Sequence, residues 1–157
     1  MDERLRNFPF LLREVSRRFV LRFEEHARLI SLTLPQCKVL VRLEKNEGVS
    51  QARLAELADV DAMTMVRILD RMESEGVIER RPDPADRRAR CLYLTPKSKP
   101  LLKEIWRLGD LTRSEVFAGI GKAELQTCMA VLEQMDSNLT VLLSKTPMTL
   151  RNVGHGS

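Results

Sequence analysis

The chain has 157 residues, enough for one compact domain whose buried core needs no disulfide bond or metal ion to stabilise it. Its composition, 43% hydrophobic and 31% charged, is that of a globular protein, and a net charge of +4 is too mild to indicate nucleic acid by itself. No apolar run approaches the roughly 18 residues that span a membrane, and the charged N-terminus lacks the apolar region of a signal peptide.

Apolar residues from Phe8 to Ile30 step mostly by three or four, which predicts a long amphipathic helix over residues 8–28. Thr33 and Gln36 then have the spacing of a capping box. They predict a second helix that ends near Gly48, a residue suited to the left-handed position after a helix.

The next two segments have the spacing of a helix-turn-helix. Ser50 is a predicted N-cap for the short helix QARLAELA, and Asp61 for the helix AMTMVRILDRMESE, which Gly76 ends. Three or four residues join them.

Two short strands, VIERR and RARCLYLT, follow and flank a turn rich in arginine. A helix-turn-helix followed by a hairpin predicts a winged helix, and the basic turn is the tip of its wing. The predicted fold is therefore mainly α with a small β-wing.

Two further helices complete the chain. Thr95 or Ser98 caps the first, which is expected to run to the Gly119–Gly121 break. The second carries a regular apolar stripe from Leu125 to Leu143. This stripe fits either an intramolecular core or a dimer interface, and residues 146–157 are predicted to be a disordered tail.

The segment from Asp61 to Glu75 predicts a recognition helix, because its apolar residues share one face and its arginines lie on the other. Arg67 is placed to bind guanine, while Met63 or Thr64 can touch a thymine methyl. Ion pairing of Arg67 and Arg71 with acids of the same helix is the alternative.

At the wing, an arginine at the hairpin tip can enter a narrow minor groove, with Asp86 holding it by a salt bridge, or the turn is simply solvated. Ser50 and Gln51 suit phosphate contact, although Ser50 also serves as a cap. The full set of predicted DNA contacts is Ser50, Gln51, Met63, Thr64, Arg67, Arg71, Asp86, Arg87, Arg88 and Arg90.

The run from LAELADVDAMTMVRILDRMESEGVIERR to DRRARCLYLT resembles the MarR family of winged helix-turn-helix regulators, and in particular its SlyA-like branch. The second piece fits the family's wing pattern D-x-R-x-x-x-[VL]-x-L-T, from Asp86 to Thr95. The resemblance extends over about residues 5–144.

The resemblance implies a cytoplasmic homodimer that binds a pseudo-palindromic operator and represses transcription. It divides the chain into a dimerisation helix (1–32), a DNA-binding domain (33–95), two more dimerisation helices (96–145) and the tail (146–157). Arg67 would read the major groove and Arg88, with Arg87 close by, the minor groove, oriented by Asp86. Met63 falls where many relatives carry Pro or Ser.

The resemblance also implies a small aromatic carboxylate effector in a cleft between the dimer and DNA-binding domains. Arg17, Arg18, Arg22 and His26 are candidate partners for its carboxylate, or ordinary surface residues. A protein-interaction module that has lost DNA specificity is a further alternative.

The three cysteines, Cys37, Cys91 and Cys128, lie far apart, which is typical of a reducing cytoplasm and not of a disulfide or zinc scaffold. Cys37 lies near the start of a helix, where the helix dipole can activate a thiol for a redox switch, although a buried inert thiol fits as well. No nucleophile–base pair, phosphate loop or metal spacing is present, so we expect no enzyme, no metal site and no cofactor.

Overall fold

The computed structural model describes residues 2–86 and 88–144. The chain divides into two compact units, Met1–Val116 and Phe117–Ser157, each of which is described by itself. The predicted tail, 146–157, lies outside the described residues.

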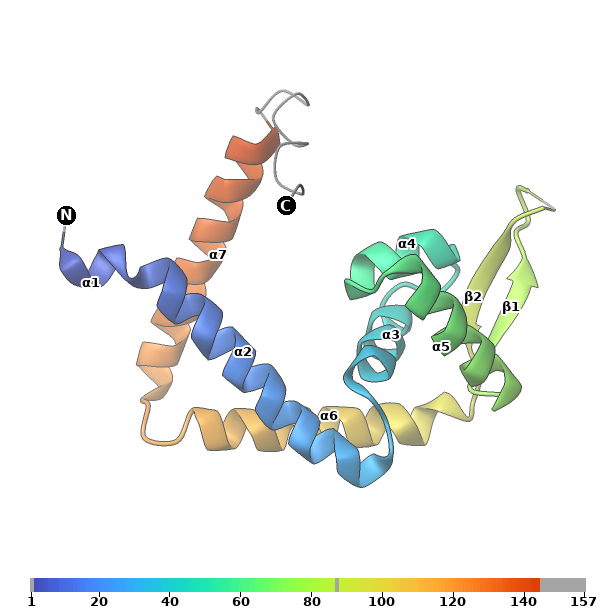
Figure 1. Ribbon diagram of the computed structural model, residues 1–157, viewed down its shortest axis with the longest axis horizontal. Coiled ribbons are helices and arrows are strands. Elements are labelled where there is room, and N and C mark those ends of the chain that lie inside the picture. The colour runs from blue at the N-terminus through green and yellow to red at the C-terminus, as the bar shows by residue number, and fades with distance from the viewer. Residues whose placement is uncertain (1, 87, 145–157) are drawn as a thin grey trace. The chain divides into compact units, whose positions relative to one another are not determined.

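The first unit is mainly helical and contains one β-hairpin, as the sequence predicts (Figure 1). A short helix at the N-terminus was not predicted; Asp2 caps it by accepting the Arg4 N–H at 3.1 Å. The elements are α1 (Glu3–Arg6), α2 (Phe8–Ala27), a 3-10 turn (Arg28–Ile30), α3 (Leu34–Glu44), α4 (Gln51–Ala58), α5 (Ala62–Ser74), β1 (Ile78–Pro82), β2 (Arg90–Leu94) and α6 (Ser98–Val116).

The predicted helix caps are present. In the capping box of α3, the Thr33 N–H donates to Gln36 Oε1 at 2.8 Å and the Gln36 N–H donates back to Thr33 Oγ1. Ser50 caps α4, and Asp61 caps α5 by accepting the Thr64 N–H at 2.9 Å. These caps fix where helices α3, α4 and α5 begin.

Two predicted helix boundaries differ from the structure. Helix α3 ends at Glu44 and not near Gly48, because Gly48 (φ 85°) already donates its N–H to the Leu92 carbonyl at 2.9 Å. Helix α6 begins at Ser98, whose hydroxyl donates to the Thr95 carbonyl and so does not cap the helix, whereas Thr95 Oγ1 accepts the Lys97 N–H. The helix ends at Val116, before the expected glycine break.

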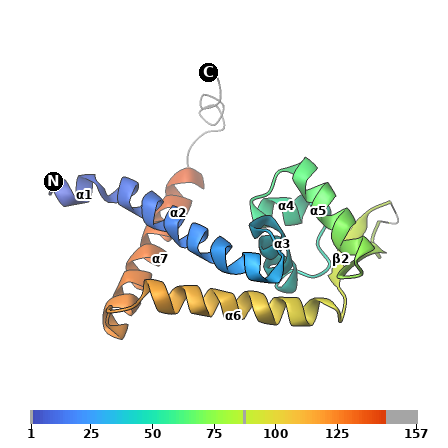
Figure 2. The same ribbon diagram turned by 60° about the horizontal axis from the view of Figure 1, so that its bottom comes forward.

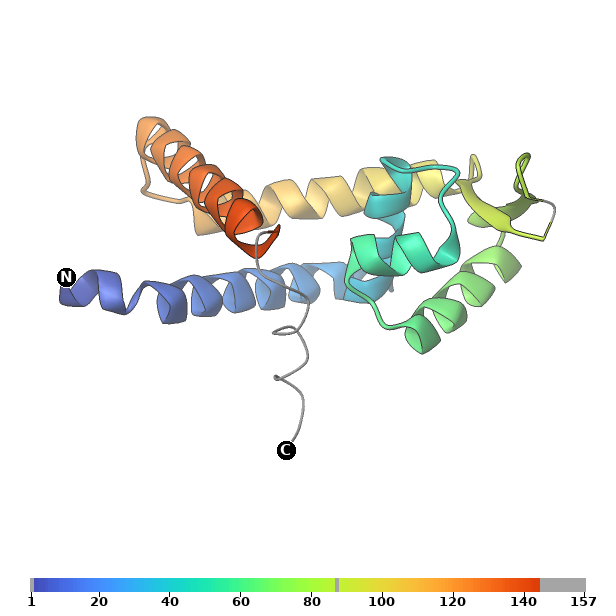
Figure 3. The same cartoon turned by 90° about the horizontal axis from the view of Figure 1, so that it is seen from above.

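The hairpin pairs β1 with β2 in antiparallel register, with Ile78 opposite Leu94 and Pro82 opposite Arg90. Ser50 forms a bridge with Cys91, so the segment before α4 adds a short third strand. Figure 3 shows the hairpin beside the C-terminal end of α5, from which the chain enters β1.

The core of the first unit lies under α5. Its predicted apolar face is confirmed, since Met65, Ile68, Leu69 and Met72 are all buried. Side chains of α3, α4 and β2 cover this face, and Figure 2 shows the three helices clustered beside the hairpin. Burying each such side chain contributes roughly 1.5–3 kcal/mol, which holds α5 in a fixed orientation.

The second unit contains α7 (Lys122–Ser144), along which no residue is buried. Four large apolar side chains, Met129, Val131, Leu139 and Val141, are 46% to 55% exposed. Within the described chain this stripe is therefore not part of a core. No helix in the described part of the chain is both long and apolar enough to cross a membrane.

Candidate nucleic-acid interface

The N-terminal turn of α5 presents its side chains to solvent. Met63 is 80% exposed, and Arg67, one turn further on, is exposed as well. The Thr64 side chain and N–H bind the Asp61 carboxylate and hold its pKa below the usual value. Asp61 thus stays ionised and keeps this helix end fixed, with Met63 and Arg67 outward.

The two arginines of α5 differ in their partners. Arg71 donates its Nε to Glu75 Oε1 at 2.8 Å, an i,i+4 pair within the helix. Arg67 makes no ion pair with any residue that the structure describes. The alternative of intrahelical pairing therefore holds for Arg71, while the Arg67 guanidinium is available to another ligand.

The arginines at the base of the wing are bound to the protein itself. Arg80 pairs with Asp70 at 2.7 Å and with Glu73, and its backbone N–H also donates to Glu73. Its side chain is only 20% exposed. Arg81 pairs with Glu79 and stacks on the Tyr93 ring at 4.4 Å. Arg80 joins β1 to α5, and this anchor was not predicted.

The tip of the wing is organised by Asp86. Its Oδ1 accepts the backbone N–H of Arg88 at 2.9 Å, and its carbonyl accepts the Ala89 N–H. Asp86 thus binds the backbone of Arg88, and among the described residues its carboxylate forms no salt bridge with the Arg88 side chain. Arg88 and Arg90 are exposed and form no ion pair within the described residues, and Arg87 lies outside those residues.

The start of α4 lies beside the wing. Ser50 Oγ accepts the Arg53 N–H at 3.2 Å and so caps the helix, while its hydroxyl hydrogen remains available to donate. Gln51 is the first residue of α4. Both residues lie at the N-terminus of α4, and a phosphate contact there stays a prediction.

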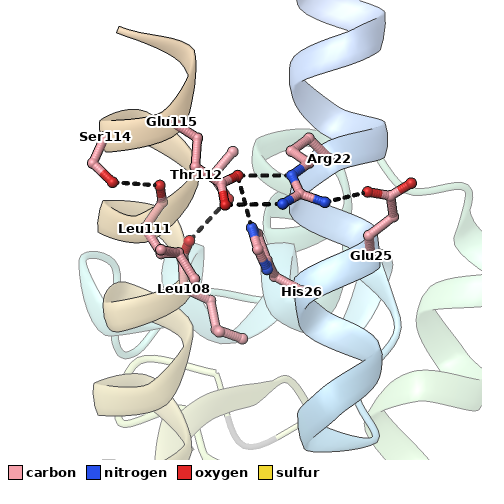
Figure 4. A network of polar contacts seen from close by, with 8 residues as sticks. All are labelled: Arg22, Glu25, His26, Leu108, Leu111, Thr112, Ser114 and Glu115. Atoms are coloured by element: carbon pink, nitrogen blue, oxygen red, sulfur yellow. Dashed lines mark hydrogen bonds and ion pairs between the residues drawn. The ribbon is translucent and has the colours of Figure 1, made fainter. Parts of the chain in front are cut away.

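The four residues predicted to bind an effector carboxylate all meet carboxylates of the protein. Arg17 and Arg18 both pair with Glu14 at 2.7 Å. Arg22 binds Glu115 through two hydrogen bonds of 2.7 and 2.8 Å, and His26 Nε2 lies 3.1 Å from the same carboxylate. Figure 4 shows this network, which ties α2 to α6.

A cavity of about 300 Å³ lies between α2, α3 and α6, and these four residues do not line it. Its apolar wall includes Phe19, Phe23, Val41, Ile105 and Trp106, and its cationic side chains are Lys38, Arg42 and Arg113. These three cations were not predicted. The spacing of Lys38, Val41 and Arg42 on α3 is the signal that could have found the first two, because it marks a second face of α3 beside the buried one. No such signal marks Arg113 on α6.

Cys37 also lines this cavity and is 2% exposed. Burial raises the pKa of its thiol to about 11, which keeps it protonated at neutral pH. A thiol becomes redox-active through its thiolate, so this burial argues against the redox alternative. Cys91 is buried, whereas Cys128 on α7 is exposed.

Residues 32–89 match the sequence model of the MarR family. A MarR family transcriptional regulator from Silicibacter pomeroyi is similar in structure, with a TM-score of 0.70 and 25% identity over 83% of this chain and 88% of that one. So is BpsR from Bordetella bronchiseptica, whose DNA binding is regulated by 6-hydroxynicotinic acid (TM-score 0.70, 25% identity, 83% and 98% of the chains).

The apo form of MarR from E. coli has a TM-score of 0.74 at 23% identity, over 81% of this chain and 94% of that one, and bears on the fold alone. The matched family and these neighbours are regulators and not enzymes. In the matched segment the chain is similar to the MarR family, and its winged-helix fold is similar to that of these solved regulators.

Proposed function

We propose that this chain is a transcriptional repressor that binds a pseudo-palindromic DNA operator as a cytoplasmic homodimer. One observation carries the proposal: Arg67 on α5 and Arg88 on the wing are exposed and without a carboxylate partner among the described residues, whereas Arg80 and Arg81 between them are paired. Cations left unpaired on both elements of a winged helix favour an anionic partner that contacts both.

In this proposal the two arginines read different grooves. Arg67 donates two hydrogen bonds to guanine in the major groove, worth about 1–3 kcal/mol of base discrimination, and Met63 or Thr64 contacts a thymine methyl. Arg88 enters the minor groove, where narrow A·T-rich sequence concentrates negative potential. The Asp86 bond to the Arg88 backbone supports this role by fixing the turn. The motifs at the wing and recognition helix suggest the SlyA-like branch.

The exposed apolar surface of the terminal helices supports the homodimer. Phe10, Leu11 and Val15 of α2 are 50% to 73% exposed, and Met129 and Leu139 of α7 are 54% and 55% exposed. Apolar surface of this extent favours association, and a second copy carries the same surface. Two-fold symmetry would then place two recognition helices on half-sites about 10 bp apart.

The cavity between α2, α3 and α6 supports a small aromatic anion as the effector. Aromatic walls suit a ring, and Lys38 and Arg42 can bind a carboxylate at its rim. Trp106 is the only tryptophan of the chain and lines the cavity, so its fluorescence reports on occupancy. Aromatic carboxylates should change this fluorescence and cause the protein to release DNA. Lys38→Met should weaken both effects. If Lys38→Met leaves both effects unchanged, the effector binds elsewhere.

The test of the main proposal is selection of bound duplexes from a random DNA pool at near-physiological salt. An enriched inverted repeat is expected. Arg67→Ala should then relax base preference at one position of each half-site, and Arg88→Ala should weaken binding most where the flanks are A·T-rich. Salt-sensitive binding with no enriched sequence would leave only the electrostatic attraction, and the protein-interaction module would replace this proposal.

A further inference from the structure

A second hollow, of about 290 Å³, lies between the N-terminus of α3 and the middle of α5. Its lining residues are Thr33, Gln36, Thr64, Arg67, Ile68 and Arg71. None of them is acidic, and two are arginines. The hollow is distinct from the cavity that faces α2 and α6, and it borders the same face of α5 that carries the proposed base contact.

Gln36 presents an unused hydrogen-bond donor to this hollow. Its Oε1 accepts the Thr33 N–H at 2.8 Å and the Thr33 hydroxyl at 3.1 Å, which identifies the other amide atom as Nε2. The residue is 5% exposed, and Nε2 has no partner among the described residues. Since the described chain contains no fully enclosed side-chain polar atom without a partner, Nε2 keeps some access to solvent, and Gln36 is one of the residues that line the hollow.

Arg71 can turn its guanidinium to the same hollow at small cost. Its pair with Glu75 joins two side chains that are 66% and 46% exposed. A solvent-exposed pair of this kind contributes little and exchanges readily for a stronger ligand. An amide N–H₂ and guanidinium groups, with no carboxylate among them, form a site for an oxyanion.

We propose that this hollow binds a backbone phosphate of DNA, held by Gln36 Nε2 and Arg71 at the edge of the groove that Arg67 reads. The inference rests on the proposed DNA binding and extends it, because it recruits α3, a helix outside the helix-turn-helix, as a phosphate contact. Phosphate contacts of this kind fix the register of a protein on the duplex and carry no base preference.

Gln36→Glu is the sharpest variant. A glutamate at this position preserves the capping box, because its carboxylate still accepts the Thr33 N–H. It replaces the Nε2 donor by an oxygen that repels phosphate. The matched control is Gln126→Glu on α7, which makes the same charge change at an exposed position of the second unit.

Affinity for the selected operator and for an unrelated duplex is measured by fluorescence anisotropy across a range of salt concentrations. Gln36→Glu should weaken binding of both duplexes by a similar factor, about tenfold. Because it places a negative charge beside the phosphate, it should also lower the salt slope, by up to about 0.9. Arg71→Gln should act in the same direction, Gln126→Glu should change neither quantity, and all melting temperatures should stay close to the parent. A duplex with one neutral methylphosphonate at the contacted position should bind the parent and Gln36→Glu alike.

An unchanged affinity and salt slope for Gln36→Glu would overturn the inference while leaving the proposed function intact. A change in base preference would also overturn it, because it would place Gln36 at a base edge. Binding of inorganic phosphate without DNA, lost in Gln36→Glu while DNA affinity stays constant, would assign the hollow to a free anion instead. A parent protein that binds no duplex would contradict the proposed function itself.

Discussion

The α5 helix and the α7 helix both carry apolar residues at helical spacing, yet only one of them is covered. In α5, Met65 and Leu69 are 0% exposed, whereas in α7 Met129 and Leu139 are 54% and 55% exposed. The periodicity of a sequence identifies an apolar face but not what covers it. The winged part closes its core within one chain, and the proposed dimer supplies the cover that α7 lacks.

The same substitution in the two helices gives the largest test of this difference. Leu69→Ala should lower the free energy of unfolding by about 2–5 kcal/mol, because it leaves a cavity under α5. Leu139→Ala should weaken association, and its effect should grow with protein concentration. Denaturant titrations at two protein concentrations, with sedimentation, separate these outcomes. An equal loss for both variants at the lower concentration would mean that α7 is packed within its own chain.

A second contrast lies within the wing, between its base and its tip. Arg80→Ala should lower the free energy of unfolding by about 1–2 kcal/mol, because it leaves the carboxylates of Asp70 and Glu73 on α5 without their cationic partner. The two side chains are 61% and 40% exposed, which limits the loss. Arg88→Ala should leave stability unchanged and weaken DNA binding. Thermal unfolding and duplex binding are measured for both, with Arg80→Lys as the conservative variant. Equal destabilisation by the two substitutions would show that Arg88 is structural.

Features that depend on neighbouring residues could be predicted from the sequence. The capping box at Thr33 and Gln36, the caps at Ser50 and Asp61 and the buried face of α5 each involve residues within one or two helical turns. Local backbone bonding and the helical period determine such features, so residue spacing is sufficient evidence for them.

The partners of the charged residues could not be predicted, because tertiary packing decides them. Arg22 meets Glu115 across 93 positions of sequence, and Arg80 meets Asp70 across the turn between helix and strand. The family resemblance suggested Arg22 as a cation open to an effector, whereas the packing of α6 gives it a carboxylate. The arginines that stay unpaired, and can therefore contact DNA in the proposed complex, are identified only once these ion pairs are known.

The smallest expected effect is on the pH dependence of the unfolding free energy, through the ion pairs that join α2 to α6. Hydrogen bonds from Arg22 and His26 hold the pKa of Glu115 at about 2, below its usual value of 4.5. A carboxyl group with a lowered folded-state pKa stabilises the fold above its ordinary pKa, and this contribution is lost as the pH falls towards the folded value. Glu115→Gln should therefore flatten the decline in unfolding free energy between about pH 5 and about pH 2, measured by denaturant titration at each pH. Because Glu14 has a similarly lowered pKa beside Arg17 and Arg18, part of the slope should persist, and Glu14→Gln is the matched control. A slope that Glu115→Gln leaves unchanged would mean that the exposed pair is screened by solvent, and that apolar packing alone holds α2 on α6.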